Sequence, residues 1–277
     1  MIKSITAKLS LVVLLISITT CYYEREINEE LEICYQGGNG LYLMNMDGSN
    51  KRRITFNNLD INPSWSPDGK TILFNSLSPA IFSINSDGSG LKQLISIGFD
   101  PVTCPTWSSD GKLILFTSQI SSLDYIFIAD INGNIITKID PYPYSPQYTT
   151  MSHDKNYIFF TDRTTPEQLH RLNINTNQQV SIGNYDPYSS TSLSPDGKIL
   201  ACTYNSNQIV FVSTEGTATS HTFFTTGSSP CWTPDGKTIV YVSTSGDIYS
   251  INIDGTNNKP LTTGGGCSEP CVQGKPK

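Results

Sequence analysis

The stretch Trp65-Ser66-Pro67-Asp68-Gly69-Lys70-Thr71-Ile72-Leu73-Phe74 decides the fold, because its first half recurs along the chain. Its proline sets φ for a turn, its aspartate can accept hydrogen bonds from nearby backbone N–H groups, and its glycine tolerates a positive φ. Close copies stand at 108–112, 194–198 and 233–237, and a degraded copy stands at 152–156. The aspartates at 68, 110, 154, 196 and 235 are therefore 42, 44, 42 and 39 residues apart. This is the period of a four-stranded β-propeller blade.

Each repeat is predicted to contain four short strands. In three repeats the first strand ends at a tryptophan, which we interpret as a core wedge, and a β-branched and aromatic run after the turn forms the second strand. A third run, such as Ile248-Tyr249-Ser250-Ile251, leads into a second glycine turn at Asp254-Gly255. A short fourth strand ends near Leu261.

The two ends of the repeat region carry partial repeats. Residues 31–56 supply the second to fourth strands of a further unit, and residues 268–273 look like a first strand that lacks a second. Joining them completes a sixth blade and leaves no open sheet edge. The sequence therefore predicts an all-β, six-bladed propeller of four-stranded blades, closed by pairing of the N- and C-terminal ends.

The repeat unit resembles that of the TolB-type propellers. The resemblance rests on the pattern P-x-W-S-P-D-G-K-x-I-x-F, followed by an I-Y-x-I strand, a D-G turn and an L-T pair, and it covers roughly residues 31–273. It implies a propeller that binds partner proteins in the periplasm. The motif residues have a structural role in the turns, so the resemblance says more about fold than about function.

The first thirty residues differ from the repeats. Lys3 and Lys8 precede an uncharged, mostly apolar run from Leu9 to Thr20, which is too short to cross a bilayer and is typical of an export signal. Ile18-Thr19-Thr20-Cys21 resembles the bacterial lipobox, although Thr20 and Ile18 replace its usual small residue and leucine. We therefore predict a signal peptide (1–20), a lipidated Cys21 with a tether (21–30) and a propeller (31–277). The predicted location is the bacterial cell envelope, in the periplasm or at the outer membrane or cell surface.

Six further cysteines would lie in a compartment that permits disulfides. Cys202 stands in an apolar run and is expected to be a buried thiol. Cys271 is expected to form a disulfide either with Cys34, which would hold the ring shut, or with Cys267 nearby in the chain.

Several classes of function find little support in the sequence. A net charge of −6 argues against nucleic acid, which needs a basic surface. The three histidines, His153, His170 and His221, fall in different repeats, and no H-x-x-x-H, C-x-x-C or G-x-S-x-G motif occurs. Enzymes with TolB-like propellers include lyases with a His-rich metal site and peptidases with a separate hydrolase domain, and this chain fits neither. We predict no catalytic residue, metal or cofactor, and interpret the repeated aspartates as turn residues.

Two equivalent loops near the ring axis are the best candidates for binding. They are rich in tyrosine, proline and aspartate, and tyrosines offer a large contact area at a low entropy cost. The predicted binding residues are Asp140, Tyr142, Tyr144, Tyr148, Arg163, Tyr185, Asp186 and Tyr188. The alternative is that these tyrosines only pack between blades.

Two functions therefore remain open. The first is a non-catalytic envelope lipoprotein that acts as a scaffold for an envelope protein partner. The second is a carbohydrate-binding or lyase-type carbohydrate-active propeller that uses the axial pocket. A sensor domain without its effector is a third option. A cluster of histidines and carboxylates in the axial channel would favour the enzyme.

Overall fold

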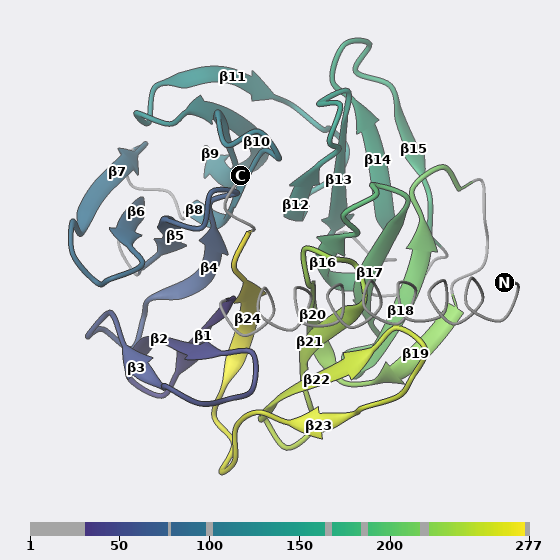
Figure 1. The fold of residues 1–277 in the computed structure, drawn as a ribbon. Helices are drawn as coiled ribbons and strands as arrows, with labels where there is room; N and C mark the ends of the chain where they lie inside the picture. The colour runs from purple at the N-terminus through teal and green to yellow at the C-terminus, as the bar shows by residue number, and fades with distance from the viewer. Residues whose placement is uncertain are drawn as a thin grey trace, which may run out of the picture.

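A computed structural model describes residues 31–76, 79–97, 102–163, 168–183, 188–216 and 222–274. In these ranges the chain forms 24 strands in six four-stranded sheets, arranged around a central axis (Figure 1). The predicted fold class, a six-bladed propeller of four-stranded blades, is confirmed.

The blades are numbered around the ring, and their strands are given from the innermost to the outermost. Blade 1 has β24 (Ser268–Val272), β1 (Glu32–Gly37), β2 (Gly40–Asn45) and β3 (Arg52–Arg53); blade 2 has β4 (Ile61–Trp65), β5 (Thr71–Asn75), β6 (Ala80–Asn85) and β7 (Lys92–Ser96); blade 3 has β8 (Val102–Trp107), β9 (Leu113–Ile120), β10 (Leu123–Asp130) and β11 (Ile135–Ile139). Blade 4 has β12 (Pro146–Met151), β13 (Tyr157–Asp162), β14 (Leu169–Asn173) and β15 (Gln179–Ser181); blade 5 has β16 (Tyr188–Leu193), β17 (Ile199–Tyr204), β18 (Gln208–Ser213) and β19 (Thr222–Thr226); blade 6 has β20 (Ser228–Trp232), β21 (Thr238–Val242), β22 (Ile248–Asn252) and β23 (Lys259–Pro260).

The repeated aspartates hold the turns between the first and second strands. Asp68 Oδ1 accepts from Ser66 Oγ at 2.7 Å and from Lys70 N at 3.1 Å, while Thr71 N donates to Ser66 Oγ at 2.9 Å. The bond from Ser66 lowers the pKa of the Asp68 carboxyl. The same three bonds recur in the turns that begin at Ser108, Ser152, Ser194 and Thr233. The interpretation of these aspartates as turn residues is therefore confirmed.

The hydrophobic core lies in the seams between blades. Each of six buried clusters draws residues from two adjacent blades. In the seam between blades 1 and 2, for example, Leu43 shares a cluster with Trp65 and Phe74. Because apolar burial is the dominant favourable term in folding, each blade depends mainly on its two neighbours.

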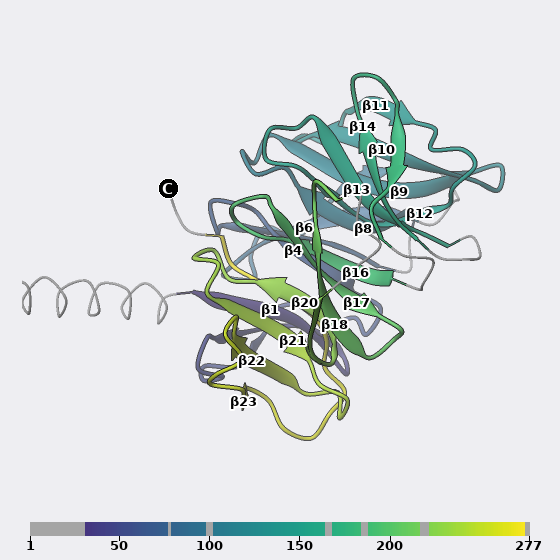
Figure 2. The ribbon, with the colours of Figure 1, turned by 90° about the vertical axis from the view of Figure 1, so that its right-hand side faces the viewer.

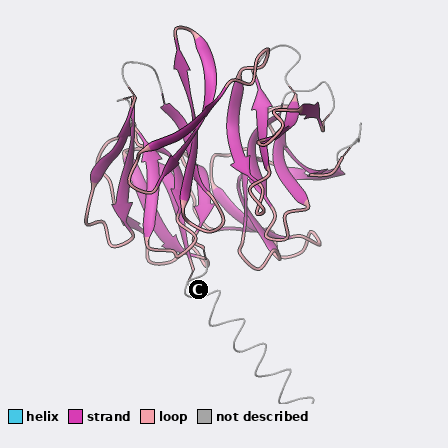
Figure 3. Ribbon diagram, turned by 90° about the horizontal axis from the view of Figure 1, so that it is seen from above, coloured by secondary structure: helices cyan, strands magenta, loops and turns pink. Residues whose placement is uncertain are grey.

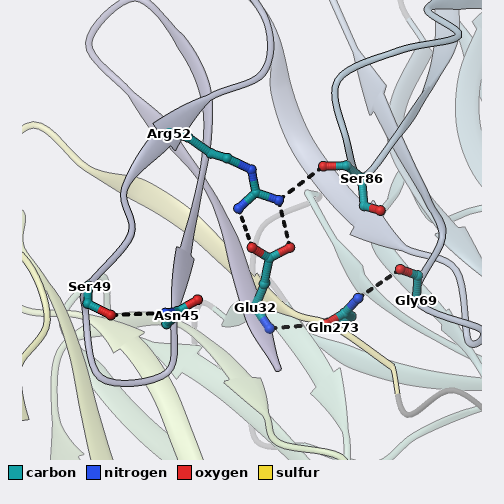
Figure 4. Close-up of polar contacts among 7 residues, drawn as sticks. All are labelled: Glu32, Asn45, Ser49, Arg52, Gly69, Ser86 and Gln273. Carbon is teal, nitrogen blue, oxygen red and sulfur yellow. Dashed lines mark hydrogen bonds and ion pairs between the residues drawn. The ribbon is translucent and has the colours of Figure 1, made fainter. Parts of the chain in front are cut away.

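The ring closes through blade 1, whose inner strand is the C-terminal β24. β24 pairs with β1 in an antiparallel ladder that places Cys34 opposite Cys271. Beyond the ladder, Gln273 Oε1 accepts from Glu32 N at 3.1 Å, and Gln273 Nε2 donates to Gly69 O in blade 2 at 2.8 Å (Figure 4). The predicted pairing of the two chain ends is therefore confirmed. The Gln273 side chain also links this closure to blade 2 through its bond to Gly69 O.

A second contact fixes the same closure. Arg52 and Glu32 form a two-pronged ion pair, in which Arg52 Nη2 lies 2.9 Å from Glu32 Oε2. The same Nη2 donates to Ser86 O of blade 2 at 3.2 Å (Figure 4). A paired guanidinium and carboxylate with parallel bonds has a defined geometry, so this contact also orients blade 1 against blade 2.

The propeller has two different faces, because successive strands of a blade run in opposite directions. The turns after the first and third strands lie on one face, here called the turn face, and the loops after the second and fourth strands lie on the other, the axial face. Figure 3 shows the strands running between two such faces. β1 begins at the turn face, and the chain leaves β24 on that same side (Figure 2). Both ends of the propeller therefore point away from the axial face.

Candidate functional site

The six inner strands line a channel along the ring axis. A cavity of about 170 Å³ lies within it, and every blade contributes residues to its wall. Glu269 is the one charged side chain among the described residues of this wall. The channel is therefore narrow and nearly neutral.

Each inner strand carries a bulge at the same position, where one residue takes a left-handed backbone conformation. These residues are Asn62 (φ 51°), Cys104 (φ 50°), Tyr148 (φ 46°), Ser190 (φ 46°), Ser229 (φ 49°) and Glu269 (φ 52°). A bulge re-aims its side chain, so six different side chains are presented around one channel on a common backbone. Sequence reasoning missed this ring because none of the six is glycine. Four of the bulged residues precede a proline, which usually holds the residue before it in an extended conformation, so this pattern did not reveal the bulge either.

Glu269 and Asn62 form the main polar contact of the channel wall. Asn62 N donates to Glu269 Oε2 at 2.6 Å, and Asn62 Nδ2 donates to Oε1 at 3.0 Å. Burial raises the pKa of the Glu269 carboxyl. Burial also raises the pKa values of the Cys104 and Cys231 thiols to about 12, so both are protonated and unreactive at neutral pH. Among the described residues, no group of three or more His, Cys, Asp or Glu side chains is arranged to hold a metal ion.

The axial loop between blades 3 and 4 separates two tyrosines that look alike in sequence. Asp140 Oδ1 accepts from Tyr142 N at 3.0 Å, and the Tyr142 side chain is 77% exposed. The Tyr144 ring instead packs on His170, with centroids 4.0 Å apart, and on Phe160 at 6.3 Å. Tyr142 is thus available for contact, whereas Tyr144 forms part of the seam.

Arg163 lies beside this loop. Arg163 N donates to Ser145 O at 3.0 Å. The Gln147 side-chain amide, with its oxygen toward the guanidinium, accepts from Arg163 Nη1 at 3.1 Å and from Nε at 3.3 Å. The structure therefore brings Arg163 next to the start of β12, on the axial face.

The other predicted binding residues are distributed differently. Tyr148 lies on β12, where it is half-buried and lines the channel. Tyr185 and Asp186 lie outside the described residues. Tyr188 is the first residue of β16, and its side chain is not among those described.

Nothing in the sequence indicated that the His170 side chain packs in the core. It is fully buried on β14, with Nε2 4.0 Å from Asp162 Oδ2. Burial lowers the pKa of His170 to about 4, although the Asp162 carboxylate acts in the opposite direction. Neither ring nitrogen has a hydrogen-bond partner among the described residues. His170 is therefore a neutral, buried ring against which the Tyr144 ring packs.

All six cysteines of the described region are free thiols. Cys202 is fully buried, as the sequence predicts. Cys34 and Cys271 are direct partners in the closing ladder, whereas Cys267 packs against the separate cluster between blades 6 and 1. The register favours Cys34 over Cys267 as the partner of Cys271, and the disulfide stays a prediction.

Cys21 lies outside the described residues. In the described ranges, no helix has the length and apolar character needed to cross a membrane.

Known proteins share this architecture. The fold is similar to TolB from Acinetobacter baumannii (TM-score 0.75, 22% identity, covering 89% of this chain and 67% of that one). It is also similar to the putative TolB from Agrobacterium tumefaciens (TM-score 0.70, 18% identity, 88% and 97%) and to a chain of the nidogen/laminin complex (TM-score 0.70, 10% identity, 88% and 99%). No curated protein matched the sequence. Residues 98–272, more than half of the chain, match the family described as the TolB beta propeller domain, and the chain therefore belongs to that family.

Proposed function

We propose that the protein is a non-catalytic scaffold of the bacterial cell envelope, which binds a partner protein through its axial face. The observation that carries this proposal is the exposed Tyr142 on the axial loop between blades 3 and 4, the same loop to which Arg163 is bonded through Ser145 O. Tyrosine and arginine are enriched among the residues that dominate protein interfaces. The similarity to TolB proteins supports an envelope location.

The loop that presents Tyr142 has a rigid base. Pro141 is buried, Tyr144 N donates to Pro141 O at 3.1 Å, and the Tyr144 ring is fixed against His170. Ser145 N donates to the buried Asp162 carboxylate at 2.8 Å. A contact residue on a pre-organised loop loses little entropy on binding, so Tyr142 can contribute much of its buried area to affinity.

The size of the channel favours a protein partner over a sugar at this face. Pockets that enclose small molecules usually measure about 300–1,000 Å³. The axial cavity measures about 170 Å³, which is below this range. A partner that rests on the rim and inserts single side chains fits this space better.

Photo-crosslinking in the native cells tests the proposal. A photoreactive phenylalanine in place of Tyr142 should crosslink to one specific envelope protein, whereas the same group in place of Phe223, which is 55% exposed on the outer strand β19, should not. Tyr142→Ala should weaken capture of that protein by about tenfold or more, as at interface hot spots, and leave the melting temperature unchanged. Equal crosslinking at both positions would show that Tyr142 is not at an interface.

We also propose that the propeller is exported and held at the membrane by a lipid on Cys21. The basic and apolar N-terminal segment and the lipobox-like residues before Cys21 support this. Because the propeller begins at its turn face, such an anchor would direct the axial face away from the membrane. Stable anchoring requires more than one acyl chain.

Changing Cys21 to serine should move the protein from the membrane fraction to the soluble fraction. Mass spectrometry of the parent protein should find acyl mass on an N-terminal Cys21, because a lipobox cysteine becomes the lipid-modified N-terminus of the mature protein. A mature N-terminus at another residue, without acyl mass, would exclude the anchor but not the protein-binding role.

A further inference from the structure

In the seam between blades 2 and 3 a small side chain stands where four other seams have a large one; the seam between blades 6 and 1, which has no tryptophan at the end of its inner strand, also has a serine there. By the register of the ladders, the equivalent central residues of the third strands of blades 1 to 6 are Leu43, Ser83, Ile128, Arg171, Phe211 and Ser250. Leu43 shares a cluster with Trp65, and Phe211 stacks on Trp232 with centroids 5.4 Å apart. At the equivalent place before Trp107 stands a serine, whose side chain is too small to cover an indole.

The small Ser83 side chain leaves a cavity of about 560 Å³ that opens on the turn face. Trp65 and Trp232 are 7% and 8% exposed, whereas Trp107 is only half-buried and forms part of the cavity wall. The Trp107 Nε1–H donates to Ser64 O at 3.2 Å, which fixes the orientation of the ring. The volume falls in the range of small-molecule sites.

Both hydrogen-bond acceptors and hydrogen-bond donors line the cavity that contains the Trp107 indole. Asp68 uses Oδ1 for its turn, so that Oδ2 can accept a bond from a ligand. Asn85 and Lys92 supply N–H donors on the opposite strands of blade 2. The second carboxylate of the wall, Asp110, is paired with Lys155 at 2.7 Å. Asp68 and Lys92 then balance each other, so the described residues of the wall offer no net charge to match an ionic ligand.

We propose that this cavity binds a neutral saccharide. The apolar face of a sugar ring would pack on Trp107, and its hydroxyls would donate to Asp68 and accept from Lys92 or Asn85. A site that hydrogen-bonds ligand hydroxyls rejects analogues that lack them, which would give the site its selectivity. The cavity opens opposite the axial face, so this inference does not depend on the proposed partner protein.

The tryptophan itself reports binding. The probes are neutral mono- to tetrasaccharides of glucose, galactose, mannose and N-acetylglucosamine, applied first as an array and then as titrations of the best binder. Trp107 is the most exposed of the three tryptophans, so a bound saccharide should shift the fluorescence emission and protect it from quenching by acrylamide. Trp107→Phe should lose this change. Failure of every saccharide to bind would overturn the proposal.

Two variants test whether binding occurs in this seam. Ser83→Phe should fill the cavity as Phe211 fills its own seam, abolish saccharide binding and leave the melting temperature equal or higher. Asp68→Asn should weaken binding about tenfold or more, the effect of losing about 1.4 kcal/mol. Asp235→Asn alters the same turn position in blade 6, distant from this cavity, and should leave binding unchanged. Saccharide binding that survives Ser83→Phe, or that falls equally in both aspartate variants, would overturn the proposal.

Discussion

A chain that lacks residues 268–277 should be less stable than the full chain by about 5 kcal/mol or more, which is comparable to the entire stability of many domains. The deletion removes the inner strand of blade 1 and the buried Val272 from the cluster between blades 6 and 1. It also leaves the buried β1 as an unpaired edge, which is a site for aggregation. Loss of both the ladder and the seam explains the size of the effect.

Denaturant unfolding of matched variants measures this effect. A chain that lacks only residues 275–277 keeps β24 and Gln273 and should unfold like the parent. Gln273→Ala should lie between the two, because it removes the bonds to Glu32 N and Gly69 O, at about 1 kcal/mol each. If the long deletion unfolds at the same denaturant concentration as the parent, closure through β24 does not stabilise the ring.

Replacement of His170 by phenylalanine should stabilise the protein, and more so in mild acid. The equivalent position on the other third strands is aromatic in four blades, as Tyr42, Phe82, Phe127 and Tyr249. The variant removes two buried nitrogens that lack partners among the described residues, a gain of about 1–3 kcal/mol at neutral pH. Phenylalanine preserves the stack with Tyr144 and Phe160.

The acid dependence follows from the lowered pKa of His170. The pKa of His170 is about 4 in the folded protein and 6.5 as its ordinary value. Between pH 4 and pH 6.5 the unfolded chain therefore binds a proton at His170 that the folded chain does not bind. The stability of the parent therefore falls as the pH drops below 6.5, by about 2 kcal/mol at pH 5, and His170→Phe should lack this loss. Unfolding free energies of both proteins at pH 8 and pH 5 give the comparison. His153→Gln, at an exposed turn position, is the control, and parallel pH profiles for parent and His170→Phe would contradict the assignment.

The fold could be predicted from the sequence because its information is local and repeated. The turn from Ser66 to Thr71 carries its own hydrogen bonds, so its residue types reveal it wherever it recurs. The three tryptophans look equivalent in the sequence because each ends the first strand of a repeat, and in the structure each does end an inner strand. Their exposure differs because it depends on a residue in the preceding blade, and Ser83 before Trp107 is visible as a gap only once the blades are placed side by side.

The candidate site could be predicted only in part. The loop at 140–148 is identified by its composition, but composition does not distinguish Tyr142 from Tyr144. Their difference arises from His170 and Phe160, which belong to another part of blade 4. The ring of bulged residues escaped notice because a left-handed conformation usually suggests glycine or asparagine, and five of these six residues are neither.

The central position of β1 in its sheet has a mechanical consequence. β1 has a hydrogen-bonded neighbour on each side, β24 and β2, and it begins at the turn face. Tension applied to a tether at Leu31 would pull β1 lengthwise between these two neighbours. Such a load is shared by both ladders at once, so their bonds must rupture together, whereas an outer strand such as β3 would peel away bond by bond. β1 is thus a strand suited to resist a pull along the tether proposed above.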